Sequence, residues 1–251
     1  MIEKLSASQS NEVYLPPLAL ERLSSFGAAS DKRFSLGNMN TTPPFTQLSL
    51  AAIAEGELVR SLLAAPHWRE WLLGLHGIPG AIRPYPEVQL ASLGKQGDID
   101  ILLVEPGRPA SAIAIQVKRA KVTESTFANG KPNKLDAIDE LKKQTNLLVE
   151  LGFSQVLAYV IVVVDSRTRN IDDFRFDGLT PELHKTIESA LSTEGLAEQA
   201  GLVRFEIVQP MDFAPLTTGS NFIRSIRMPK AQVQPQSLTE WITKLVRERD
   251  A

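Results

Sequence analysis

The chain has no cysteine and only three histidines among its 251 residues. The lack of cysteine excludes a disulfide framework, a thiolate metal site and a cysteine nucleophile, and it suits a cytoplasmic protein. His67, His76 and His184 show neither metal-ligand spacing nor an HExxH pattern. The sequence also lacks a GxSxG elbow, a GxxxxGKS or GxxxxGKT loop and a dinucleotide-binding glycine fingerprint, which weakens the case for the enzyme classes that use them.

Long apolar runs and a charge surplus are also missing. No stretch of about 18 apolar residues occurs, and the first four residues show no basic-then-apolar signal pattern, so we expect neither a membrane span nor export. Lys and Arg number 27 against 29 Asp and Glu, a formal net charge of −2. A nucleic-acid partner would therefore have to be bound by a local basic patch.

What is present is a predicted β-hairpin over residues 97–121. Two alternating apolar runs, 98–104 and 112–118, flank a turn-rich segment centred near Arg108. Side chains alternate faces along a strand, and this register places Asp100 opposite Gln116 and Asp98 opposite Lys118. Polar groups would then converge at the tail ends of two apolar strands. A plainer reading is that these are polar residues where strands begin or end.

A helix is predicted over residues 46–65, before the hairpin. At about 100° per residue one face is apolar, and Glu55 falls in its middle. A carboxylate there is costly unless it is paired or binds a cation. The alternative is a partly exposed Glu55 or a buried ion pair. The members of this face are Leu48, Ala52, Val59, Leu62 and Leu63.

The remaining elements predict an α/β protein with a mixed sheet flanked by helices. We expect an N-terminal arm (1–45), a core (46–165) and a C-terminal α/β extension packed on that core (166–251). Phe127 to Lys134 predicts a loop, and the basic residues between Arg224 and Arg249 a solvated surface. The further elements expected are helices 67–75, 135–151, 180–191 (capped by Thr180) and 238–249 (capped by Ser237), and strands 84–90, 156–164 (buried on both faces) and 202–208.

An acidic residue on a first helix, then Asp, then a strand with Gln-x-Lys resembles the PD-(D/E)xK nuclease superfamily. The helix Ala54 to Leu63 looks like the opening helix of archaeal Holliday-junction resolvases. The run Gly97-Asp98-Ile99-Asp100 is similar to the GEIDL-type strand of small predicted nucleases, and Gln116-Val117-Lys118 to the QxK form of Mrr-type restriction endonucleases. The resemblance covers roughly residues 50–165 and implies a restriction-endonuclease-like αβββαβ core.

The resemblance implies a metal-dependent endonuclease that hydrolyses DNA in restriction, defence or repair. Mg²⁺, with Mn²⁺ able to substitute, would be bound by oxygen atoms of Asp100, Gln116, Glu55 and Asp98. Lys118 would orient or activate the attacking water and stabilise the charge that develops on phosphorus. The catalytic set is then Glu55, Asp100, Gln116 and Lys118. The candidate strand and phosphate contacts are Arg119, Lys121, Lys131, Lys134, Lys142, Lys143 and Gln144.

Two other functions remain open. The chain could be a catalytically weak or inactive nucleic-acid-binding or assembly subunit, because Gln116 replaces a charged ligand by a neutral one. It could also cleave RNA. We expect a homodimer if both strands of a duplex are cut, and a partner protein could target or activate the enzyme.

Overall fold

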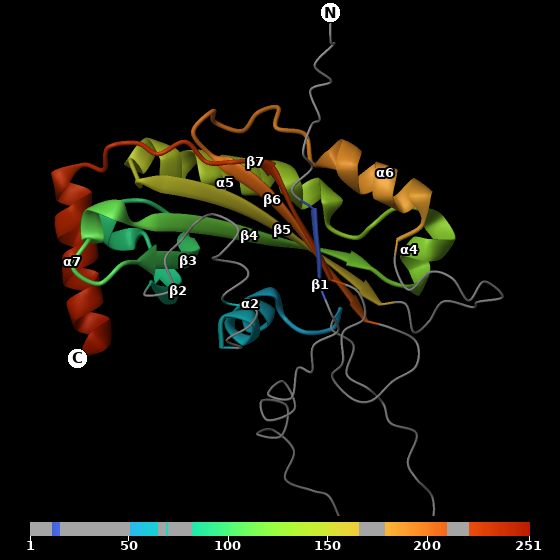
Figure 1. Cartoon of the computed structure of the whole chain (residues 1–251), viewed down its shortest axis with the longest axis horizontal. Helices are drawn as coiled ribbons and strands as arrows, with labels where there is room; N and C mark the ends of the chain where they lie inside the picture. Colours follow the sequence, from blue (N-terminus) through green and yellow to red (C-terminus); the bar gives the residue numbers. More distant parts are fainter. Residues whose placement is uncertain (1–11, 16–50, 65–68, 70–81, 166–178, 210–220) are drawn as a thin grey trace, which may run out of the picture.

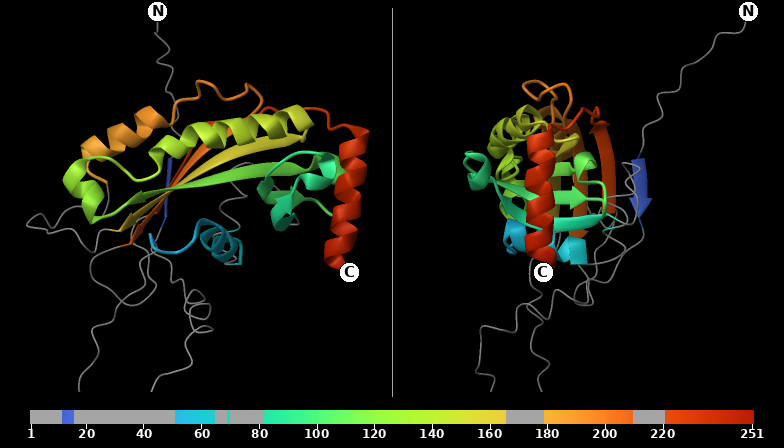
Figure 2. Two further views of the ribbon diagram at one scale, coloured as in Figure 1. Left: turned by 180° about the vertical axis from the view of Figure 1, so that it is seen from behind. Right: turned by 90° about the vertical axis from the view of Figure 1, so that its left-hand side faces the viewer.

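The computed structural model of the chain describes residues 12–15, 51–64, 69, 82–165, 179–209 and 221–251. These residues form a seven-stranded mixed sheet with strand order β1-β7-β6-β5-β4-β3-β2. The helices α5 and α6 lie over one face and α2 lies against the other (Figures 1 and 2). The predicted α/β class with a mixed sheet is confirmed.

The helices and strands follow the chain in this order: β1 (Glu12–Leu15), α2 (Glu55–Ala64), β2 (Arg83–Gln89), β3 (Asp98–Val104), β4 (Ile113–Val122), α4 (Glu124–Asn129), α5 (Ile138–Leu151), β5 (Gln155–Asp165), α6 (Pro181–Ala190), β6 (Gly201–Gln209), β7 (Asn221–Arg227) and α7 (Gln236–Asp250). Short 3-10 turns lie at Ala91–Leu93, Pro109–Ser111 and Leu135–Ala137.

The predicted hairpin is present and its recorded pairs have the predicted register, but the predicted pair of Asp98 and Lys118 is not among them. Strands β3 and β4 are antiparallel, and Ile101 lies opposite Ile115 while Leu103 lies opposite Ile113. The same register carried outward places Asp100 opposite Gln116. The recorded β3–β4 pairing nevertheless ends at Ile101, whereas β4 continues to Val122. One edge of β4 therefore runs on without its hairpin partner.

Strand β5 is the central strand of the sheet, and it is buried on both faces as predicted. It runs parallel to β4 and to β6. Tyr159, Ile161 and Val163 pack in the core on the α2 side. Val160 and Val162 pack on the other face, in the core that includes residues of α5 and α6. A near-continuous apolar run is what such a two-sided environment requires.

The last third of the chain completes the same sheet. Strand β7, which the sequence pattern did not predict, pairs with β6 and with β1. Its arginines are not simply solvated: the side chain of Arg227 donates from Nε to the Ala200 carbonyl at 2.8 Å. Helix α7 lies across the end of the sheet near β2 and β3 (Figures 1 and 2), and Arg249 donates from Nη1 to the Pro86 carbonyl at 2.9 Å.

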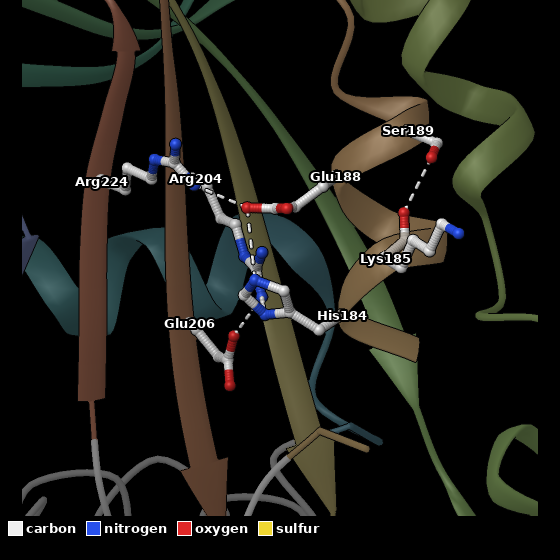
Figure 3. Close-up of polar contacts among 7 residues, drawn as sticks. All are labelled: His184, Lys185, Glu188, Ser189, Arg204, Glu206 and Arg224. Atoms are coloured by element: carbon white, nitrogen blue, oxygen red, sulfur yellow. Dashed lines mark hydrogen bonds and ion pairs between the residues drawn. The ribbon is translucent and has the colours of Figure 1, made fainter. Parts of the chain in front are cut away.

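A polar network joins α6 to β6 and β7 (Figure 3). The buried Arg204 lies with Nη2 2.6 Å from Glu206 Oε2 and 3.3 Å from His184 Nδ1. Glu188 Oε1 lies 3.2 Å from His184 Nε2 and 2.6 Å from Arg224 Nη1. Because these side chains come from three elements, the network supplements the apolar packing of α6.

Three local predictions are wrong. Residues 51–54 form a turn and a bend, so α2 begins at Glu55, and Ala52 is exposed. Phe127 to Asn129 belong to α4 rather than to a loop. Helix α7 begins at Gln236 with Pro235 at its N-cap, so Ser237 does not cap it. Leu48 and the predicted helix 67–75, apart from Arg69, lie outside the described residues.

Thr180 is the N-cap predicted from the sequence, and its Oγ1 accepts from the N–H of Leu183 at 3.3 Å. We expect Thr180→Ala to lower the free energy of unfolding by about 1 kcal/mol, because a helix-end N–H loses its acceptor. Ser237→Ala, which removes a hydroxyl from the first turn of α7, should change it by less than about 0.5 kcal/mol. Denaturant titration of both variants measures this, and equal effects would contradict the capping role.

Candidate active site at the open edge of β4

The open edge of β4 presents backbone N–H groups that the hairpin no longer satisfies. Two of them are taken by side chains: Val117 N–H donates to Asp100 Oδ2 at 2.7 Å, and Arg119 N–H donates to Glu55 Oε2 at 2.5 Å. A third, from Lys121, donates to the Asn133 carbonyl at 3.2 Å. Alternate N–H groups of a strand point to the same edge, so two carboxylates and a carbonyl line this edge in sequence.

Glu55 lies at this edge because α2 starts there. Its second oxygen, Oε1, is 3.4 Å from Lys118 Nζ, and both side chains are about one-quarter exposed. The carboxylate also lies in the first turn of α2, where the helix dipole favours a negative charge. Glu55 is thus a paired carboxylate, as one reading of its position in the sequence required.

Arg119 holds the start of α2 against β4. It is 3% exposed, and its Nη1 donates to the carbonyl of Ile53, just before the helix. The sequence suggested Arg119 as a phosphate contact. Its burial contradicts that role, because a side chain turned inward onto a backbone carbonyl has no access to a nucleic-acid backbone.

Asp98 and Gln116 lie at the other end of the same edge. Gln116 Nε2 donates to the backbone carbonyl of Asp98 at 2.6 Å, which joins the start of β3 to β4 after their regular pairing has ended. Both residues line a cleft of about 300 Å³ between the start of β3, β4 and α5. Gln144, a predicted contact, lines this cleft too.

The electrostatics of the site centre on Asp100. The pKa of this carboxyl is raised from 3.8 to about 6, mainly because the group is removed from water and also because Asp98 and Glu55 carry negative charges nearby. The hydrogen bond from Val117 and the charge of Lys118 act in the opposite direction. A partly buried carboxylate with two acidic neighbours is a group whose ionised form a bound cation would stabilise.

Only a small number of protein oxygen atoms at this edge could bind a divalent cation. Among the described residues, no three His, Cys, Asp or Glu side chains are grouped so that they could hold a metal ion. Gln116 donates from Nε2 to the Asp98 carbonyl, so its amide oxygen is the atom that could bind a cation together with the Asp100 carboxylate. Two protein oxygens suit Mg²⁺, which keeps several waters and binds substrate phosphate. Glu55 already pairs with Lys118 and accepts from the backbone N–H of Arg119.

The predicted basic contacts do not all gather at the site. Lys121 lies on the β4 edge, and burial, together with the charges of Arg119 and Lys134, lowers its pKa. Lys134 is exposed beside it, and Lys131 pairs with Asp136 at 3.4 Å. Lys142 is about 160° around α5 from Gln144 and lies 3.7 Å from Asp139, so it is not brought to the cleft.

Two further polar residues line the cleft, Gln96 and Glu140, and neither was predicted from the sequence. Glu140 lies four residues before Gln144 on α5, and side chains at this spacing share a helix face. That spacing is a signal the sequence carries. No comparable signal exists for Gln96, because the loop before β3 has no periodicity that would direct its side chains.

The chain matches no protein-family model and no curated protein sequence. Within the part of the chain that the structure describes, no helix has the length and apolar character needed to cross a membrane.

The raised pKa of Asp100 predicts a pH-dependent effect on stability. The folded chain binds this proton more tightly than the unfolded chain, so the ionised carboxylate destabilises the fold above about pH 6, and the cost disappears below about pH 4. Asp100→Asn stays neutral and keeps an oxygen for Val117 N–H. We expect it to raise the free energy of unfolding by about 2 kcal/mol at about pH 8.

Denaturant titrations in EDTA at about pH 8, 6 and 4 test this prediction. The advantage of Asp100→Asn should shrink as the pH falls through 6 toward 4. Asp139→Asn is the matched control, because the Asp139 side chain is 84% exposed. If Asp100→Asn is no more stable than the wild type at about pH 8, the raised pKa of Asp100 is contradicted.

Proposed function

We propose that the chain is a Mg²⁺-dependent nuclease that hydrolyses phosphodiester bonds of DNA at the open edge of β4. The observation that carries the proposal is the convergence of Asp100, Gln116, Lys118 and Glu55 on that edge, although Glu55 and Lys118 are 63 residues apart in the chain. Folding accounts for the two carboxylates as acceptors of β4 N–H groups, but it does not require a lysine and an amide beside them. The resemblance to PD-(D/E)xK nucleases implies that these four residues would support metal-dependent phosphodiester hydrolysis.

In this proposal Asp100 and Gln116 hold the metal ion, with Asp98 as a further acidic group beside it. The ion, Mg²⁺ or Mn²⁺, would lower the pKa of a bound water and neutralise charge on the scissile phosphate. Gln116 is oriented for this by its hydrogen bond to the Asp98 carbonyl. The neutral amide makes the site less negative than two carboxylates would, so we infer that the metal is bound weakly before substrate arrives.

Lys118 is the proposed catalytic cation, and Glu55 is its positioning residue. The ammonium group, on a side chain about one-quarter exposed, lies 3.4 Å from Glu55 Oε1 and can orient the attacking water or stabilise charge on phosphorus. Glu55 itself accepts a hydrogen bond from the backbone N–H of Arg119. The backbone of β4 therefore fixes Glu55, and Glu55 in turn positions the ammonium group of Lys118.

A binding or assembly subunit without turnover is the second candidate. The observation that favours it is that Asp100 and Glu55 already satisfy N–H groups of β4, which is a structural reason for carboxylates at these positions. RNA as the substrate is a further alternative. A role in restriction, defence or repair, and a homodimer or a partner protein, follow only from the nuclease proposal.

We expect Asp100→Ala and Lys118→Ala each to lower metal-dependent DNA cleavage at least about 100-fold, because each removes a group that acts on the scissile phosphate or its metal. Supercoiled plasmid, linear duplex, single-stranded DNA and RNA would be incubated with Mg²⁺, Mn²⁺ or EDTA. Asp139→Ala and Lys185→Ala serve as controls outside the site. No cleavage by the folded wild type, or cleavage that survives both site substitutions, would overturn the assignment.

Substitutions of Arg119 and Lys121 should have different effects although the two residues are close in the chain: the first should affect stability and the second DNA binding. Arg119→Ala should lower the free energy of unfolding by about 2–3 kcal/mol, because a buried carbonyl loses its donor and the side chain leaves a gap. Lys121→Ala should leave stability within about 0.5 kcal/mol and reduce the salt dependence of DNA affinity by about one counterion. Thermal unfolding and binding titrations at several salt concentrations measure both, and a stability loss in Lys121→Ala would contradict its assignment as a phosphate contact.

A further inference from the structure

The cleft beside Asp98 and Gln116 is larger than a metal ion and its waters need. Its volume of about 300 Å³ is at the lower end for small-molecule sites, where a single nucleotide unit fits and a double helix does not. Asp98 and Gln116 belong both to the cleft and to the proposed metal edge. An occupant of the cleft would therefore lie next to a phosphate bound at that edge.

The chemistry of the cleft suits a nucleobase rather than a phosphate. Leu90 and Leu147 supply apolar surface, and Gln96 and Gln144 supply amide donors and acceptors. Two acidic residues, Asp98 and Glu140, face one cation, Lys143, which lies 3.8 Å from Glu140. This negative balance disfavours a phosphate but accepts an uncharged base, whose exocyclic amine can donate to a carboxylate.

Along β4, the cleft suited to a nucleobase and the cations suited to the nucleic-acid phosphates lie at different positions. The cleft lies on the α5 side at Gln116, whereas Lys118 and then Lys121 follow along the edge of the strand. The five residue-to-residue steps of strand from Gln116 to Lys121 span about 16 Å. Cations are thus available for the backbone of a short stretch of single strand, while its base at one end enters a neutral-to-negative cleft.

We propose that this cleft binds one unpaired nucleobase next to the scissile phosphate, so that the enzyme acts on DNA whose strand is single, frayed or flipped at the cut. The inference rests on the proposed nuclease function and deepens it by naming the state of the substrate. A paired base cannot reach such a cleft without the cost of unpairing and unstacking, and this cost makes an intact duplex the poorer ligand.

Binding in EDTA tests the cleft without cleavage. The probes are a single-stranded DNA with one 2-aminopurine, its blunt duplex, and a duplex in which the 2-aminopurine lies opposite an abasic site. We expect the wild type to bind the single strand and the abasic duplex at least about tenfold more tightly than the blunt duplex. The 2-aminopurine fluorescence reports entry of the base, and comparison of the first and third probes separates a free strand from a flipped base.

Two cleft variants make the test specific. Gln144→Ala removes an amide, and Leu147→Trp fills the cleft with a larger side chain. Each should weaken binding of the single strand about fivefold or more, as expected for a lost hydrogen bond or an obstructed site. Glu150→Ala, on an exposed position of the same helix, should change binding less than about twofold. Thermal unfolding of each variant establishes that it folds.

The outcomes separate this inference from the nuclease proposal. Binding that discriminates against the blunt duplex and depends on Gln144 and Leu147, without cleavage in Mg²⁺, supports the nucleobase site and contradicts the nuclease. Cleavage that needs Asp100 and Lys118 but proceeds equally on blunt duplex and single strand, with both cleft variants unchanged, overturns the nucleobase site and leaves the nuclease standing.

Discussion

The structure depends on one constraint at its candidate site: a strand edge without a neighbouring strand leaves N–H groups that must find acceptors. Strand β4 continues beyond its regular pairing with β3. The N–H groups of Val117, Arg119 and Lys121 there donate to Asp100, Glu55 and the Asn133 carbonyl, respectively. An unsatisfied N–H costs more than most single contacts provide. Satisfying the edge therefore brings α2, β3 and the segment before α5 to β4.

Because the same carboxylates satisfy backbone groups and form the candidate site, stability and function are in tension at Asp100. Burial favours the protonated form of this carboxyl, whereas a metal site needs the ionised form. This conflict between stability and function is smaller at Glu55 and Arg119. Their contacts connect α2 to β4, and Lys118 pairs with a carboxylate that this connection already holds in place.

The far parts of the chain serve the site indirectly. Strands β6 and β7 extend the sheet beyond β5, and the network of His184, Arg204 and Glu206 helps to hold α6 on that side (Figure 3). Helix α7 buries Leu238 and Ile242 in the core that contains residues of β2, β3 and α5. The end of the sheet where the cleft opens is thus supported by residues from the end of the chain.

The sequence by itself determined the hairpin register, the buried central strand β5 and the Thr180 cap, because each follows from local alternation, a continuous apolar run or one capping side chain. It also brought Asp100 and Gln116 together, since both lie on that hairpin. Tertiary structure alone decided that β4 continues past β3, that Arg119 points inward, and that Gln96 and Glu140 share a cleft with Asp98. These depend on which segments meet across the fold, and no local pattern records distance between residues far apart in the chain.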